Sequence, residues 1–264
     1  MSEFSQSLYL SRIGLTSAPE ATLAGLKAIH QAQHRSIAFE NFDVASGLGI
    51  DPLPQGFINK LLQTKRGGYC FELNGLLGLA LEHFGFDVQK LLARVHLSGQ
   101  PSARTHLLLL VNLDGQQWLV DSGFGSQTPR APVPLVFDQT FPIDYQTFRL
   151  QEDKHYGVML EGLQNDEWIK LYSFDFTHVC DSDILCGNHY TATNPDSHFV
   201  SSCVAALPTE EGIITLLNQT LRIRNADGVA EQELNPDDYI AAVRRYFGIE
   251  LDYPVTALNP LQAE

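Results

Sequence analysis

The chain has 264 residues, of which 44% are hydrophobic and 18% charged, and its formal net charge is −14. This length and composition are ample for a hydrophobic core and argue against long disordered tracts. The negative charge argues against nucleic acid or an anionic membrane surface as a partner, because both require a basic footprint. An anionic ligand would have to find a local positive group or free backbone N–H groups.

The N-terminus and the cysteines both bear on cellular location. Residues 1–6 show neither the basic nor the apolar region of a signal peptide, and no later stretch is long and apolar enough to cross a bilayer. The four cysteines, at positions 70, 180, 186 and 203, include no C-x-x-C pair and are too few for a disulfide framework. We therefore expect the protein to be cytoplasmic, because cysteines stay reduced in that compartment.

Apolar residues at helical spacing predict that residues 1–85 are mostly helical. Residues 17–20, Ser-Ala-Pro-Glu, have the form of a capping box and predict a helix start there. A loop containing Gly and Pro over residues 44–53 precedes another predicted helix, which runs into a bend at residues 66–68.

From about residue 86 the period changes to that of strands. Strand-like runs cover residues 88–97, 105–113, 116–121, 147–151, 156–161, 168–174, 200–206 and 212–224. Asp114-Gly115 predicts a hairpin turn, and residues 187–198 read as a polar loop. A last helix is expected to open at Asn235-Pro236 and to stop at Gly248. Helices first, strands next and a mixed tail predict an α+β protein.

Cys70 stands where a glycine bend meets a helical run. Leu73, Leu76, Leu77 and Ala80 recur at the helical period behind it, and Gly85 ends the run. The N–H groups and the positive dipole end of a helix N-terminus favour a thiolate, which is how a cysteine is prepared for attack. The alternative is a cysteine packed in the core, a common fate of free cysteines.

His106 differs from most of the nine histidines because it lies inside an apolar strand, where an unpartnered imidazole is costly. If Asp114-Gly115 forms a two-residue turn, position 108 faces Asp121 across the hairpin. Asp121 is then the diagonal neighbour of His106 on the same face, where a carboxylate would orient the base of a cysteine nucleophile. A satisfied core histidine and a turn-forming aspartate are the alternatives.

Three other groups of residues have weaker signals. The glycine-containing run at residues 121–126 could present N–H groups to a phosphate or a pantetheine amide, or be a plain turn. Cys180, Cys186 and His189 fit no standard zinc spacing, so we expect no metal. His30 and His34, like residue 83, lie on helical segments among polar neighbours and are interpreted as surface residues.

The sequence resembles the arylamine N-acetyltransferases over nearly its whole length. Residues 66–74, Arg-Gly-Gly-Tyr-Cys-Phe-Glu-Leu-Asn, look like the signature of that family, and residues 37–43 resemble its I-P-F-E-N-L-D stretch. Residues 105–109 and 119–125 resemble its histidine and aspartate motifs, and residues 194–199 resemble its S-P-x-S-x-F segment. Several motifs in the same order are far more specific than any one of them.

The resemblance implies a three-part fold with a core like that of cysteine proteases. Its parts are an N-terminal helical bundle carrying the nucleophile (residues 1–85), a central β-barrel carrying the histidine and aspartate (86–198), and a C-terminal α/β lid (199–264). Cys70, His106 and Asp121 fall on the family's catalytic triad. Acetyl-coenzyme A (acetyl-CoA) is the implied donor and an arylamine or arylhydrazine the implied acceptor, with transfer in two steps through an acetyl-cysteine.

The resemblance also implies binding residues. The positions that line the family's acceptor pocket are Phe39, Val95, Phe124 and Phe199, and those near its coenzyme contacts are Ser102, Ala103, Gly125 and Ser126. The chain departs from the family pattern in having Ala38 for proline, Ser122 for a small apolar residue, Asn194 for serine, and Ala103 where glycine can occur.

Other activities share the order Cys, His, Asp along the chain. One is a related acyl transfer or amide closure in natural-product metabolism. Another is a transglutaminase-like enzyme or cysteine hydrolase, which would need no coenzyme A. A non-enzymatic binding module on an enzyme scaffold is the remaining alternative, although such a module has no need of an intact triad.

Overall fold

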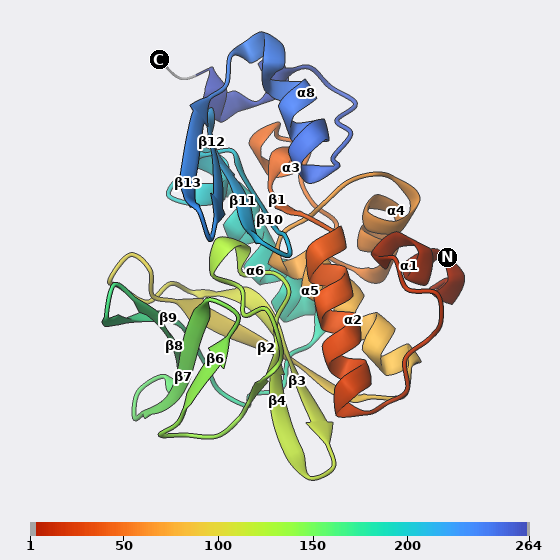
Figure 1. Ribbon diagram of the computed structural model, residues 1–264, viewed down its shortest axis with the longest axis vertical. Coiled ribbons are helices and arrows are strands. Elements are labelled where there is room, and N and C mark those ends of the chain that lie inside the picture. Colours follow the sequence, from red (N-terminus) through yellow and green to blue (C-terminus); the bar gives the residue numbers. More distant parts are fainter. Residues whose placement is uncertain (1–3, 263–264) are drawn as a thin grey trace.

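The computed structural model describes residues 4–262 (Figure 1). Residues 1–3 of the N-terminal stretch 1–6, considered above for a signal peptide, lie outside the described residues. The α-helices are α1 (Gln6–Ile13), α2 (Leu23–Ser36), α3 (Phe42–Ala45), α4 (Pro54–Gln63), α5 (Cys70–His83), α6 (Asp181–Thr193), α7 (His198–Ser201) and α8 (Pro236–Phe247). Short 3-10 helices are η1 (Gly125–Gln127), η2 (Val255–Ala257) and η3 (Asn259–Leu261). Within residues 4–262 no helix is long and apolar enough to span a membrane.

Helix α5 is the centre of the N-terminal part. Its predicted apolar positions are buried, and they share one core with residues of α1, α2, α4 and the large sheet. The helix begins at Cys70 and gives way to Gly85, whose φ of 88° favours glycine, as the sequence predicts. Because α5 is covered by other elements on nearly all sides, its first residue is held in one place.

The large sheet has eight strands and curves into a barrel-like form in the lower half of Figure 1. Their order is β5 (Val133–Pro134), β4 (Gln116–Val120), β3 (Arg104–Leu113), β2 (Asp87–Val95), β9 (Glu167–Phe174), β8 (Gly157–Gln164), β7 (Gln146–Asp153) and β6 (Thr140–Ile143). The predicted hairpin is confirmed: Leu113 pairs with Gln116, and Asp114 and Gly115 both have positive φ, the pattern of a type I′ turn. The helices and the two sheets together confirm the predicted α+β class.

The second sheet joins the two ends of the chain. Its strand order is β1 (Phe39–Glu40), β10 (Val204–Pro208), β11 (Gly212–Leu217), β12 (Thr220–Asn225) and β13 (Gly228–Glu233). Helix α8 covers one face through an apolar core of its own (Figure 1). Since β1 comes from the N-terminal third, the parts predicted at 1–85 and 199–264 share a sheet, and the three-domain division stays a prediction.

Three local predictions were wrong. Helix α2 begins after Thr22 rather than at residues 17–20, because the Thr22 hydroxyl caps the Gly25 N–H at 3.2 Å. Much of the stretch predicted as polar loop at 187–198 belongs to α6, whose buried side includes Ile184, Gly187 and Asn188. The strand predicted at 200–206 starts only at Val204, after the single turn of α7.

A buried cluster of charges lies behind the bend that precedes Cys70. The Arg66 guanidinium lies 3.0 Å from Glu40 and 2.7 Å from Asp43, and the Lys60 ammonium lies 2.9 Å from Asp43 and 3.0 Å from Glu72. Burial and the neighbouring Glu40 raise the pKa of Glu72 to about 7, against the opposing effect of Lys60. These ion pairs connect β1, α3, α4 and α5 at the base of the bend.

We expect Arg66→Met to lower the free energy of unfolding by about 3–5 kcal/mol, because it removes the nearer of the two cations that neutralise buried Glu40 and Asp43 and leaves Lys60 alone for both. Urea unfolding at pH 7.5 measures this. Lys65→Met is the matched control: Lys65 pairs with Glu250 at 3.1 Å, but its side chain is 70% exposed, so its loss should stay below about 1 kcal/mol. Equal losses in the two variants would contradict the prediction.

Candidate active site

Cys70 occupies the first position of α5 and is 3% exposed. The helix start is fixed by Glu72, whose carboxylate accepts the Tyr69 N–H at 3.1 Å. Other segments approach so closely that side chains are excluded: a Cβ on Gly123 would lie 2.8 Å from the Cys70 Cα, and one on Gly68 would lie 2.6 Å from the Glu72 carboxylate. The glycines at the bend therefore serve close approach rather than a left-handed backbone.

His106 and Asp121 meet as the hairpin register requires. The Nε2 atom of His106 lies 2.7 Å from Oδ2 of Asp121, and both residues are buried. The imidazole is enclosed by the rings of Phe124 and Tyr172, each with its centroid 4.9 Å away. Because Nε2 is engaged by the carboxylate, Nδ1 is the nitrogen left for another partner.

The electrostatics of the pair favour a charged imidazole. Burial by itself would lower the pKa of His106, but the charge of Asp121 and the hydrogen bonds of His106 to Asp121 and Cys70 outweigh it and raise the pKa to about 10. For Asp121, burial opposes ionisation, yet His106 and its other donors hold the carboxyl pKa below its ordinary value. The site thus contains an imidazolium and a carboxylate next to the Cys70 sulfur, which lies at a helix N-terminus.

Asn74 is a site residue to which the sequence analysis assigned no role. Its Nδ2 donates to Asp121 Oδ1 at 2.8 Å and to the Leu107 carbonyl at 2.7 Å, and its Oδ1 accepts the Ser122 N–H at 2.8 Å. Asn74 lies one turn after Cys70 on α5, so both side chains point to the same side of the helix. A buried amide in an apolar helix, four residues after the cysteine, was the available signal.

His30 and His34 were wrongly interpreted as surface residues, since both are buried. The His30 Nε2–H donates to the Asp121 carbonyl at 2.8 Å, and Gln33 on the same helix donates to the Ser122 hydroxyl at 3.1 Å. Burial lowers the pKa of both histidines, so both are neutral at pH 7. Helix α2 therefore holds the segment of Asp121 and Ser122 in place, and the Asp121 side chain of this segment is bound to His106.

The four candidate acceptor-pocket residues come from separate parts of the chain. Phe39 and Phe199 contact each other with ring centroids 5.9 Å apart, and both pack on the apolar cluster that contains Cys70. Phe124 packs instead against the His106 ring. Val95, at the end of β2, is paired with Tyr172, the second ring that covers the imidazole.

The four candidate coenzyme residues form two pairs. Gly125 and Ser126 lie in η1, and a Cβ on Gly125 would lie 3.5 Å from the Phe39 ring. The Ser102 hydroxyl is already engaged, since it accepts the Val95 N–H at 2.9 Å and donates to a carbonyl of its own loop. The residue after it, Ala103, lines a separate cavity.

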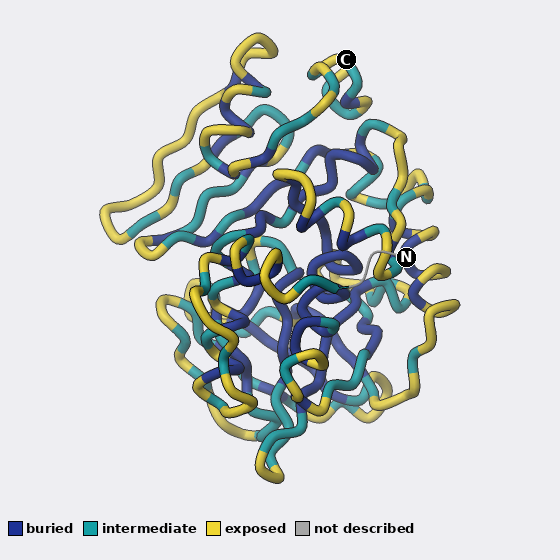
Figure 2. Tube along the Cα trace, turned by 90° about the vertical axis from the view of Figure 1, so that its right-hand side faces the viewer, coloured by how far each residue is buried: buried dark blue, intermediate teal, exposed yellow. Residues whose placement is uncertain are grey.

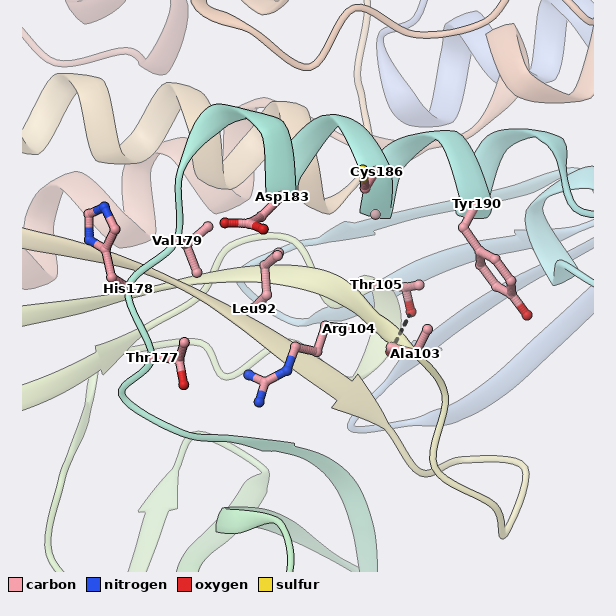
Figure 3. Close-up of a pocket in the computed structure, with 11 residues that line it drawn as sticks. Leu92, Ala103, Arg104, Thr105, Thr177, His178, Val179, Asp183, Cys186 and Tyr190 are labelled. Atoms are coloured by element: carbon pink, nitrogen blue, oxygen red, sulfur yellow. Dashed lines mark hydrogen bonds between the residues drawn. The ribbon is translucent and has the colours of Figure 1, made fainter.

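That cavity, of about 410 Å³, lies between α6 and the facing ends of β2 and β3 (Figure 3). Arg104, Thr105, Cys186 and Tyr190 are among its lining residues, whereas Cys70 is not. In the part of the chain that the structure describes, no group of three or more His, Cys, Asp or Glu residues could hold a metal ion.

Comparisons with known proteins bear on the family of the chain. A model of an N-acetyltransferase family matches residues 22–256. The arylamine N-acetyltransferase of Mycobacterium tuberculosis is 36% identical over 233 residues, 86% of this chain and 82% of the relative; that of Escherichia coli is 35% identical over 250 residues, covering 92% and 88%.

Solved structures extend the likeness to the fold. An arylamine N-acetyltransferase from Salmonella typhimurium superposes with a TM-score of 0.92 at 29% identity, covering 98% of each chain. The Mycobacterium marinum enzyme in complex with CoA gives a TM-score of 0.90 at 31% identity, covering 97% of each chain. The curated relatives are arylamine N-acetyltransferases, which are acyltransferases, so the matches define the chain as an acyltransferase. The chain belongs to the arylamine N-acetyltransferase family.

We expect His30→Leu to lower the free energy of unfolding by about 1–3 kcal/mol, because it leaves the buried Asp121 carbonyl without a donor. The control is His34→Leu. His34 is buried one turn further on α2 and contacts the His30 ring, and its replacement should cost less than about 1 kcal/mol. Urea unfolding at pH 7.5, where both histidines are neutral, compares them. A larger loss for His34→Leu would refute the role of His30 as the stabilising donor to the Asp121 carbonyl.

Proposed function

We propose that the chain transfers an acetyl group from acetyl-CoA to an arylamine or arylhydrazine in two steps, through an acetyl group on Cys70. The observation that carries the proposal is the buried His106–Asp121 pair, joined at 2.7 Å, whose imidazole interacts with a cysteine at a helix N-terminus strongly enough to help raise the pKa of His106. His106 is assigned as the proton carrier and Asp121 as the residue that orients and charges it.

In the first step the Cys70 thiolate attacks the thioester carbonyl. A new bond forms from the Cys70 sulfur to the carbonyl carbon, and the carbonyl oxygen takes negative charge opposite the free N–H groups at the start of α5. When the carbon–sulfur bond to coenzyme A breaks, Nδ1 of His106 gives its proton to the departing sulfur. The products are free coenzyme A, acetyl-Cys70 and a neutral imidazole.

In the second step the amine nitrogen attacks the acetyl carbon. An arylamine is weakly basic, so it is neutral at pH 7 and has a free lone pair. His106 takes one proton from the nitrogen as the bond to Cys70 breaks, which restores the thiolate and imidazolium. Phe39, Phe124 and Phe199 are proposed to hold the aromatic ring beside Cys70, with Val95 at the edge of the pocket.

The remaining proposals concern context. The three segments at 1–85, 86–198 and 199–264 are proposed as helical, barrel and C-terminal parts that meet around Cys70. Gly125 and Ser126 are proposed to contact the coenzyme, with Ser102 and Ala103 nearby. A cytoplasmic location is proposed from the cysteine pattern, since acetyl-CoA and reduced thiols occur together there.

Brief exposure to acetyl-CoA should add one acetyl group to the intact protein, as measured by mass spectrometry. Cys70→Ala should show no adduct, whereas Cys186→Ala, which changes an exposed cysteine, should acylate like the wild type. An added arylamine should discharge the adduct. An acetyl group retained by Cys70→Ala, or no adduct on folded wild-type protein, would refute the proposal.

The acylation rate should fall as the pH rises through about 10, because His106 then loses the proton that the leaving sulfur needs. The stability of the folded protein should change with pH in the same direction. The charged His106–Asp121 pair contributes fully to the free energy of unfolding below the ordinary histidine pKa of 6.5, and this contribution is lost as the pH rises through about 10.

Asp121→Asn should move the descending limb of this pH profile to lower pH, because burial still lowers the pKa of His106 while the opposing charge is gone. The rate at pH 7.5 should fall by roughly 10³- to 10⁴-fold. Stopped-flow measurement of coenzyme A release over pH 6–10.5 gives both numbers. An unmoved limb would remove Asp121 from the role assigned to it.

A further inference from the structure

Ser122 carries a hydroxyl directly after Asp121, at a position where the family pattern has a small apolar side chain. The residue is only 3% exposed. Burying a hydroxyl costs free energy unless hydrogen bonds replace its hydration. The Ser122 hydroxyl has two such partners, Gln33 Nε2 at 3.1 Å and Asn74 Oδ1 at 3.2 Å.

The amide of Gln33 has one possible orientation. Its Nε2 lies 2.9 Å from the Leu73 carbonyl, which can only accept, so the second Nε2 hydrogen is the one that goes to the Ser122 hydroxyl. The amide oxygen, Oε1, accepts the Tyr9 O–H at 2.9 Å. Burial raises the pKa of the Tyr9 hydroxyl well above its ordinary value, so Tyr9 remains a donor while a histidine titrates.

The amide of Asn74 is fixed in the same way. Its Nδ2 donates to the Leu107 carbonyl at 2.7 Å and to Asp121 Oδ1 at 2.8 Å, which uses both hydrogens. Its Oδ1 accepts the Ser122 N–H at 2.8 Å. Because the Ser122 oxygen already accepts from Gln33, its own hydrogen points to Asn74 Oδ1.

The result is one chain of hydrogen bonds in which every member donates toward the Asp121 carboxylate. Its members, in order, are Tyr9 on α1, Gln33 on α2, Ser122, and Asn74 on α5. The elements that carry them meet in the buried interior, where Figure 2 shows the trace dark blue at the centre of the molecule. Hydrogen bonds in series polarise one another in a low-dielectric interior, so each bond strengthens the next.

We infer that the Ser122 hydroxyl is a positioning group, which stabilises the negative charge on Asp121 through Asn74. A carboxylate that is held in its charged form keeps the proton on His106, which is the proton that the proposed transfer uses. The inference rests on the proposed function for the use of this proton, but not for the hydrogen bonds themselves.

The titratable and charged groups around the His106–Asp121 pair come from several elements. They are Cys70 on α5, Tyr172 on β9, His30 and His34 on α2, and Arg130 in the loop before β5. The Ser122 hydroxyl binds Gln33 and Asn74, which are both neutral, so its removal deletes none of these charges. A change at His106 after removal of the hydroxyl is therefore an effect of the hydrogen bonds.

An NMR titration of His106 tests the inference without turnover. In protein with isotope-labelled histidine, the His106 imidazole is assigned by its absence from His106→Asn, and in the wild type it should titrate at about pH 10. In Ser122→Ala it should titrate about 0.5–1 pH unit lower, because the charge on Asp121 has lost part of its support. In Tyr9→Phe the midpoint should fall by less than about half as much, because three further hydrogen bonds lie between Gln33 and the carboxylate.

The matched control is Ser173→Ala, which removes an equally buried hydroxyl outside the chain of hydrogen bonds. Ser173 is 1% exposed and its hydroxyl lies 2.9 Å from His96 Nε2. The control should lose stability in urea unfolding, as Ser122→Ala does, but should leave the His106 midpoint unchanged. The descending limb of the acylation rate should move with the NMR midpoint in each variant.

Two results would overturn the inference. One is an equal shift of the His106 midpoint in Ser122→Ala and Ser173→Ala. The other is an unmoved midpoint in whichever of Ser122→Ala and Tyr9→Phe are folded. If the midpoint moves as expected and acetyl-CoA does not acylate Cys70, the proposed function fails and the positioning role of Ser122 stands.

Discussion

The carboxylate of Asp121 is the group on which the rest of the site depends. A charge buried this deeply is tolerable only if hydrogen bonds replace its hydration, and Asp121 receives them from His106, Asn74 and the Gly123 N–H. Each donor comes from a different segment, and His30 adds a fourth through the Asp121 backbone. The requirement of one buried charge thus fixes the helical part, the hairpin and the start of α5 relative to one another.

The central part of this arrangement was predictable because it is set by short-range rules. A two-residue turn at Asp114-Gly115 fixes the hairpin register, and strand alternation then puts His106 and Asp121 on one face. The start of α5 at Cys70 follows from a glycine bend before a helical run. With those two facts the candidate chemistry could be predicted from the sequence, although the roles themselves remain proposals.

What the sequence did not reveal depends on contacts between distant segments. His30 was misread because polar neighbours hide the side of α2 that faces the Asp121 backbone. Helix α6 was missed because its polar and small residues give no clear apolar stripe, and its buried side is defined by packing on β3. The pairing of Phe39 with Ala206 has no local signal at all.

The chain uses much of its limited positive charge internally. Lys60 and Arg66 neutralise buried carboxylates behind the bend, and Arg12 donates to three backbone carbonyls. Arg130 does the same for the turn of the smaller sheet.

The hydrogen bonds of β1 also constrain when the site can exist during synthesis. The Asn41 side chain and the Val204 N–H that it binds are 163 residues apart, and the two short strands at this point pair only after the intervening barrel has emerged. Long-range pairings of this kind form late, because the closing of a long loop comes before any gain from contact. A nascent chain that already contains Cys70, His106 and Asp121 therefore still lacks Phe199, which packs on the cluster around Cys70, so the Cys70 thiol gains its full enclosure only near the end of translation.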